Sequence, residues 1–166
     1  TGKSTVGRLL ADALRRPFID ADAHLESRAG RTIASIFADS GEVVFRNWEE
    51  RIIAEITSTG TNAILATGGG AVLREVNRVR LREFGFIVWL KASADVLPAR
   101  LTAAPGALSD RPALTSAGTL GEISRVLESR LPLYHDLADV AVDTEGCSPS
   151  QVVETIRNIL RDRSIV

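Results

Sequence analysis

The chain is poor in the residues that mark several large protein classes. Its 166 residues include one cysteine, Cys147, and no methionine. A single cysteine excludes an internal disulfide framework, so a cytoplasmic setting is the simplest expectation. No apolar run is long enough to span a bilayer and no signal-peptide pattern is visible, so we expect no membrane partner. The absence of methionine, even at the first position, predicts that further residues precede Thr1 in the natural protein.

Charge of one sign is also lacking. The formal net charge is −1, with 25% charged and 45% hydrophobic residues. No global basic field recruits nucleic acid, so we expect no nucleic-acid partner, and any bound anion must be held by local arginines. The length suits a single domain with one sizeable core, and neither repeats nor an interdomain linker are visible. We therefore expect one domain over residues 1–166.

Short apolar runs alternate with helical patterns along the chain. This alternation predicts an α/β fold, a three-layer α/β/α sandwich around a central parallel sheet. Four strands are expected in this chain and five in the complete protein. The expected strands are 17–19, 63–66, 86–90 and 140–142. The expected helices are 4–14, 21–29, 33–38, 42–58, 73–84, 94–103 and 120–131, with a last one capped by Ser148 and started by Pro149.

The chain opens on Gly2-Lys3-Ser4-Thr5, followed directly by a helical pattern. Such a sequence binds phosphates through backbone N–H groups at a helix N-terminus, while lysine adds charge and serine ligates Mg²⁺. Four common residues can equally be an ordinary helix start. The helix behind them and the α/β alternation favour the phosphate site. The strand and glycine turn that normally precede such a site are absent, and we interpret this as truncation.

Asp20 and Asp22 come just after the first expected strand. Ligands of open α/β sheets bind at the carboxyl ends of strands. One carboxylate could hold metal-bound water and the other could accept hydrogen bonds from a substrate hydroxyl. Helix capping by Asp22 would be the ordinary interpretation of an isolated Asp-x-Asp.

Three consecutive glycines, Gly68, Gly69 and Gly70, follow the second expected strand. A plain turn needs one glycine or two. Three at this sheet edge favour close approach of backbone to a ligand, with N–H groups available to bind it.

Three arginines are candidates for holding an anion. Arg46 follows an aromatic residue, and Glu49 lies one helical turn on, where it can orient the guanidinium. Arg111 lies in a long Ala/Gly/Pro/Ser-rich segment of the type that closes over a reacting phosphate. Arg130 precedes Pro132-Leu133-Tyr134. Each one taken alone is most often a solvated surface residue.

The order of these motifs resembles the shikimate kinase family, within the P-loop nucleoside-monophosphate-kinase-like group. The resemblance covers nearly the whole chain and is more specific than any one motif. It implies phosphorylation of the 3-hydroxyl of shikimate by ATP with Mg²⁺, in a monomer of the P-loop kinase type. Shikimate would be the small-molecule partner.

The resemblance implies a phosphate end built by the first residues. Gly2, Lys3, Ser4 and Thr5 would bind ATP, with Lys3 on the β- and γ-phosphates. Ser4 would ligate Mg²⁺, and Asp20 would hold the metal through water. Lys3 would also count among the catalytic residues.

A lid over about residues 103–118 would bring Arg111 onto the transferring phosphoryl group and the nucleotide. Pro149 would lie near the adenine base. Arg100 has no settled place on the adenine or phosphate side.

For shikimate, the resemblance implies that Asp22 binds the hydroxyls and orients or deprotonates the attacking one. Arg46 and Arg130 would clamp the carboxylate, with Glu49 positioning Arg46. Phe37 and Phe45 would wall the pocket, and the backbone N–H groups of Gly68, Gly69 and Gly70 would bind the substrate.

One departure from the family pattern and two rival functions stay open. Ala66 offers no side chain where other P-loop proteins place a metal-binding carboxylate, so Asp20 must serve. A related kinase, such as one acting on gluconate, would share the phosphate loop and lid, although the glycine triplet and paired arginines argue against it. A nucleotide-binding module without catalysis is the non-enzyme rival.

Overall fold

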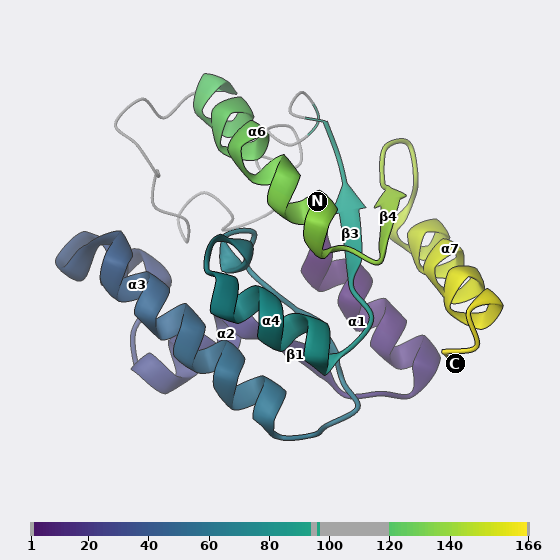
Figure 1. The fold of residues 1–166 in the computed structure, drawn as a ribbon, viewed down its shortest axis with the longest axis horizontal. Coiled ribbons are helices and arrows are strands. Elements are labelled where there is room, and N and C mark those ends of the chain that lie inside the picture. The colour runs from purple at the N-terminus through teal and green to yellow at the C-terminus, as the bar shows by residue number, and fades with distance from the viewer. Residues whose placement is uncertain (1, 94–95, 97–119, 166) are drawn as a thin grey trace.

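The computed structural model describes residues 2–93, 96 and 120–165, and the expected helix at 94–103 and the lid at 103–118 lie almost wholly outside them. Helices and short strands alternate along the chain (Figure 1). In order they are α1 (Lys3–Leu14), β1 (Phe18–Asp20), α2 (Ala21–Ala29), α3 (Ile33–Ser58), β2 (Ile64–Ala66), the 3₁₀ turn η1 (Ala71–Leu73), α4 (Glu75–Phe84), β3 (Val88–Lys91), α6 (Leu120–Leu137), β4 (Val140–Asp143) and α7 (Pro149–Asp162).

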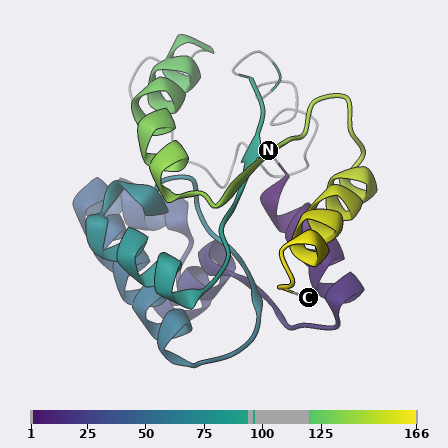
Figure 2. The same cartoon turned by 45° about the vertical axis from the view of Figure 1, so that its right-hand side comes forward.

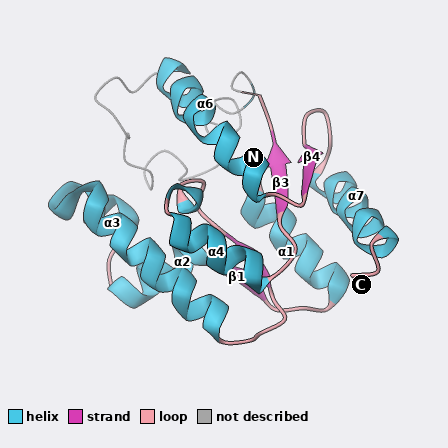
Figure 3. Ribbon diagram, in the orientation of Figure 1, coloured by secondary structure: helices cyan, strands magenta, loops and turns pink. Residues whose placement is uncertain are grey.

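The strands form two parallel pairs (Figure 3). β1 pairs with β2, placing Asp20 opposite Ala66, and β3 pairs with β4, placing Lys91 opposite Asp143. The four expected parallel strands are therefore confirmed. In the part of the chain that the structure describes, no ladder joins the two pairs, so they are linked by side-chain packing and not by backbone hydrogen bonds.

Helices cover both faces of the strands, which confirms the expected layers. Figure 2 shows α1 and α7 on one side and α3 with α4 on the other. Successive residues of β2 point to opposite faces, because Ile64 packs with the α1 and α7 residues while Leu65 packs with the α3 side. The cluster on the α1 and α7 side also includes Leu90 of β3, so it spans both strand pairs. Its buried members are Val6, Leu10, Leu90, Val142, Val152, Val153, Ile156 and Leu160.

α3 joins the two helices expected at 33–38 and 42–58 across a kink. Gly41 has φ 78° and ψ 176°, a left-handed φ that favours glycine. In the second half, Phe45, Arg46, Glu49, Ile52 and Ile56 are buried while Val44 is exposed. The interior face of this helix therefore includes two charged residues, whose burial a hydrophobic pattern alone does not mark.

α6 runs six residues beyond the expected end at Leu131. Pro132 lies inside it, although proline removes a backbone donor from the helix. Leu133, Tyr134 and Leu137 pack into the cluster around η1, and this tertiary packing holds the helix past the proline. Arg130 and Tyr134 consequently share one helix face.

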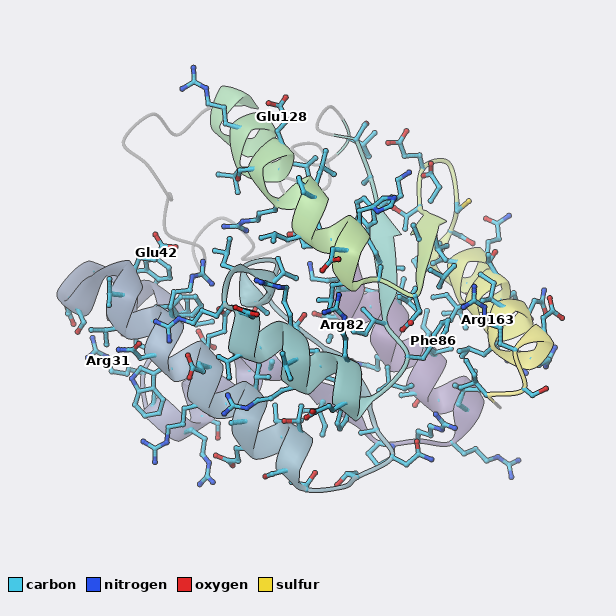
Figure 4. All side chains as sticks on the ribbon, in the orientation of Figure 1. Arg31, Glu42, Arg82, Phe86, Glu128 and Arg163 are labelled. Atoms are coloured by element: carbon cyan, nitrogen blue, oxygen red, sulfur yellow. The ribbon has the colours of Figure 1, made fainter. Side chains whose placement is uncertain are left out.

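The last helix begins as the sequence predicts. Ser148 accepts a hydrogen bond from the Gln151 N–H, and the Gln151 side chain accepts one from the Ser148 N–H, which completes a capping box. Beyond its end, the Arg163 guanidinium lies 5.2 Å from the centre of the Phe86 ring (Figure 4). Among the described residues, no helix is both long and apolar enough to cross a membrane.

Candidate active site

The first turn of α1 meets the carboxyl end of β1. The Ser4 hydroxyl donates to Asp20 Oδ2 at 2.6 Å. The other oxygen, Oδ1, accepts from the N–H groups of Asp22 at 3.1 Å and Ala23 at 3.4 Å, so Asp20 also caps α2. The cap is therefore Asp20 and not Asp22, so helix capping does not account for the Asp22 carboxylate.

Ser4 and Asp20 are thus brought together, as expected for two residues serving one metal. A hydroxyl and a carboxylate are hard oxygen donors, and Mg²⁺ is bound by few protein oxygens together with phosphate and water. The pair fits that requirement. Within the described residues no group of three or more His, Cys, Asp or Glu could form an all-protein metal cage. Lys3 lies in the same first turn, directly after Gly2, whose φ is 81°.

The glycine triplet lies against side chains of three different elements. A methyl group added to Gly68 would come within 2.9 Å of Asp22 Oδ1 and 3.3 Å of Glu49 Oε1. One added to Gly69 would come within 3.1 Å of Tyr134 Oη and 3.8 Å of Arg130 Nη1.

Gly70 is the most crowded of the three, because a methyl group there would collide with the Arg46 guanidinium. None of the three is among the glycines with positive φ. They are therefore needed for close approach of these side chains and not for an unusual backbone conformation.

Arg46 is held at the centre of this cluster. Its Nη1 donates to Glu49 Oε2 at 2.8 Å, and its Nε and Nη2 donate to Glu42 Oε1 at 3.2 Å each. Glu42 (Figure 4) is thus a partner of Arg46 that was not among the expected site residues. The guanidinium lies 4.8 Å from the centre of the Phe45 ring, and Phe45 in turn contacts Phe37 at 4.6 Å between ring centres. The expected phenylalanine wall therefore lies beneath Arg46.

Glu49 is buried, and its second oxygen is unpaired. Only 4% of the residue is exposed, and Oε1 has no hydrogen-bond partner among the described protein atoms. Burial raises the pKa of Glu49 above its ordinary value, and Arg46 opposes that shift while Asp22 adds to it. The unpaired oxygen points to the Gly68 side of the cluster, where Asp22 also lies.

Arg130 and Tyr134 approach the triplet from α6. The Tyr134 hydroxyl donates to the carbonyl oxygen of Gly69 at 2.6 Å. The sequence pattern alone gives Tyr134 no role. Its four-residue spacing from Arg130 is the signal that could have identified it, provided the helix was known to continue past Pro132.

The structure thus brings together Asp22, Arg46, Glu49, Arg130 and the glycine triplet, and separately Ser4 and Asp20. Pro149 starts α7 after β4 and is exposed. Arg100, Arg111 and the expected lid lie outside the described residues.

Comparisons with known proteins agree on one family. The sequence matches the family described as "Shikimate kinase" over residues 1–161. It is 43% identical over 163 residues to a shikimate kinase of Symbiobacterium thermophilum, covering 98% of this chain and 92% of that protein. It is 42% identical to one of Rhodopseudomonas palustris, covering 97% and 76%. That residues precede Thr1 in the natural protein stays a prediction.

Solved structures show the same fold. A shikimate kinase from Acinetobacter baumannii, in complex with shikimate, aligns with a TM-score of 0.91 at 32% identity, over 99% of this chain and 89% of that one. One from Aquifex aeolicus aligns with a TM-score of 0.80 at 31% identity, over 98% and 92%.

Proposed function

Since the chain belongs to the shikimate kinase family, we propose that it transfers the γ-phosphate of ATP to the 3-hydroxyl of shikimate. The activity is ATP-dependent phosphorylation of shikimate. One observation carries the assignment of its site, namely that Asp22, Arg46, Glu49 and Arg130 converge on the glycine triplet.

The arginines supply the carboxylate recognition that shikimate requires. Arg46 and Arg130 approach the triplet from α3 and α6, at Gly70 and Gly69 respectively. A planar guanidinium pairs with a carboxylate through two parallel hydrogen bonds, so two of them suit one carboxylate. Glu49 and Glu42 hold Arg46 in place and leave it partly neutralised, which limits how tightly it binds anions in general.

Asp22 supplies the acceptor for the reacting hydroxyl. Asp20 caps α2, and the Asp22 carboxylate lies against Gly68 beside the unpaired Glu49 oxygen. Phosphoryl transfer depends mostly on alignment and on charge placed around the moving group. We propose that Asp22 holds the attacking hydroxyl in line and accepts its proton.

The phosphate end follows from the first turn of α1. Gly2, Lys3, Ser4 and Thr5 would bind the β- and γ-phosphates, and the helix N-terminus favours negative charge. Mg²⁺ bound at Ser4 and Asp20 would neutralise charge between the phosphates. Lys3 would aim its ammonium at the γ-phosphate.

Several finer assignments remain part of this proposal. They are the contact of Arg111 with the transferring phosphoryl group, the place of Pro149 near the base, the lid at about 103–118, the single domain over 1–166, the monomeric state and the cytoplasmic location. The single cysteine, Cys147, is exposed and unpaired, as a reducing compartment allows.

A coupled ADP-release assay tests the function, with shikimate, gluconate and nucleoside monophosphates as alternative acceptors. Direct titration with shikimate in the absence of ATP accompanies it. We expect saturable binding of shikimate and turnover with shikimate alone among the acceptors. Turnover with gluconate would favour the related small-molecule kinase, and ATP binding with no turnover on any acceptor would favour the non-catalytic module.

A further inference from the structure

Tyr134 connects two parts of the substrate site that come from distant segments. It lies on α6, one turn after Arg130, and its hydroxyl donates to the Gly69 carbonyl, 65 residues away in sequence, at 2.6 Å. Arg130 Nη1 approaches the same glycine. This hydrogen bond therefore joins the helix that bears Arg130 to the glycine turn, residues 68–72.

The tyrosine ring is fixed on its other side. It stacks on Trp89 of β3, with ring centres 5.7 Å apart and an angle of 30° between the planes. Burial raises the pKa of Tyr134 above its ordinary value, while Arg130 opposes that shift, so the phenol stays protonated and able to donate at neutral pH. Packing against Trp89 locates the ring, and the hydroxyl then fixes the turn.

The other end of the glycine turn is held by α4. Asn77 is fully buried and donates from Nδ2 to the Ala71 carbonyl at 3.1 Å, while Arg78 Nη1 donates to the Val72 carbonyl at 2.7 Å. These bonds anchor the turn to α4 but reach no substrate-binding element. Among the described hydrogen bonds that reach residues 68–72, the one from Tyr134 links them to a helix with a candidate carboxylate ligand. Just beyond this turn, Arg74 donates to Glu50 and Asn47 of α3, at 2.6 and 2.7 Å.

We propose that Tyr134 is a positioning residue that sets the distance between Arg130 and the glycine turn and thereby the affinity for shikimate. The inference rests on the proposed function. It predicts that loss of the hydroxyl weakens shikimate binding while ATP binding and the chemical step change little. The ATP end is built from α1 and β1, and Tyr134 is bonded to neither.

Tyr134→Phe tests this, because it keeps the ring on Trp89 and removes only the hydroxyl. We expect the KM for shikimate to rise about three- to tenfold, the range that one net hydrogen bond supplies, with kcat and the KM for ATP within about twofold. Thr57→Val is the matched control. It also removes a partly buried hydroxyl bonded to a carbonyl, that of Ile53 at 2.7 Å, but at the far end of α3 from Arg46 and Glu49. It should leave both KM values unchanged.

The single tyrosine of the chain provides a direct spectroscopic readout. Protein labelled with 3-fluorotyrosine carries one fluorine resonance, at Tyr134, which we expect to shift on adding shikimate and not on adding ATP alone. A Tyr134→Phe variant with unchanged shikimate KM overturns the positioning role while the wild-type enzyme still turns over shikimate. An equal rise in the KM values for ATP and shikimate in this variant would show a merely structural role, and it would also overturn the positioning role. A wild-type protein that neither binds nor phosphorylates shikimate rejects the proposed function itself.

Discussion

Two glutamates of α3, Glu49 and Glu55, each pair with an arginine, and the pKa values of the two carboxyl groups are shifted in opposite directions. In the first, Arg46 and Glu49 lie 2.8 Å apart with 10% and 5% of their side chains exposed. In the second, Arg28 of α2 reaches Glu55 at 2.5 Å, with 58% and 33% exposed. The pKa of Glu49 is raised and that of Glu55 is lowered.

Burial explains the difference. At Glu55 the hydrogen bond from Arg28 is the largest influence, followed by one from His24, and both stabilise the charged carboxylate. At Glu49 the cost of desolvating the charge exceeds what Arg46 returns. A short distance between the charged groups of an ion pair therefore does not indicate the role of the pair. The exposed pair is an ordinary surface ion pair, and we propose that the buried one holds an arginine in place for a substrate carboxylate.

The largest effect is expected from Asp22→Asn, which preserves the shape of this half-buried side chain and removes only its charge. Turnover should fall by about 10²- to 10⁴-fold, the range for loss of a general base. Steady-state ADP release measures it, with Asp12→Asn on the exposed face of α1 as the control. Near-normal turnover in the Asp22→Asn variant would exclude an essential base role for Asp22.

Arg46→Lys and Arg28→Lys compare the two pairs directly. Lysine keeps the charge but cannot bind a carboxylate through two parallel hydrogen bonds. We expect Arg46→Lys to raise the KM for shikimate about 10- to 100-fold with little change for ATP, the scale of a lost charge-assisted pair. Arg28→Lys should change neither. Equal losses for ATP and shikimate in the Arg46→Lys variant would mean that Arg46 does not bind the carboxylate.

Glu49→Gln should alter the pH dependence of stability. Because the folded pKa of Glu49 lies above the ordinary 4.5, its contribution to stability is fully present below that value and is lost as pH rises through the raised pKa. The stability of wild type relative to Glu49→Gln should therefore fall with rising pH, by at most about 1.4 kcal/mol per pH unit. Urea unfolding of both proteins at a series of pH values from 4.5 upward measures this difference in stability. A stability advantage of wild type that grows with rising pH would contradict the expectation.

Glu55→Gln should have the smallest effect on stability, and its pH dependence should have the opposite sign to that of Glu49→Gln. The pKa of Glu55 is lowered, so its contribution is present above the ordinary 4.5 and is lost as pH falls through the lowered value. The free energy of unfolding of the wild-type protein should be slightly larger than that of the variant at neutral pH, and the difference should vanish in acid. Added salt should weaken this effect and leave that of Glu49 largely unchanged, since exposed pairs are screened more strongly.

Much of the site could be predicted because its motifs follow strand ends. Asp20 ends β1, Asp22 follows it and the glycine triplet follows β2, and parallel strands bring their carboxyl ends to one edge. Their order along the chain therefore indicated both the edge and its chemistry. The α/β layers followed from the same alternation.

What the glycines contact could not be predicted. That Gly70 faces Arg46, and Gly69 faces Tyr134, depends on how α3 and α6 pack over the turn. The apolar pattern does not mark the burial of Arg46 and Glu49 on α3, because charged residues usually lie on the surface. Tyr134 was missed for a local reason, since Pro132 suggested a helix end that tertiary packing overrides.

We propose that the cluster around Arg46 and Arg130 recognises the carboxylate of shikimate. Calorimetric titration of the wild-type protein with shikimate and with its neutral carboxamide tests this most directly, because the two ligands differ only in that group. We expect shikimate to bind at least about tenfold more tightly than the carboxamide, and Arg46→Lys to remove most of this preference. Equal affinity of the wild-type protein for the two ligands would contradict it.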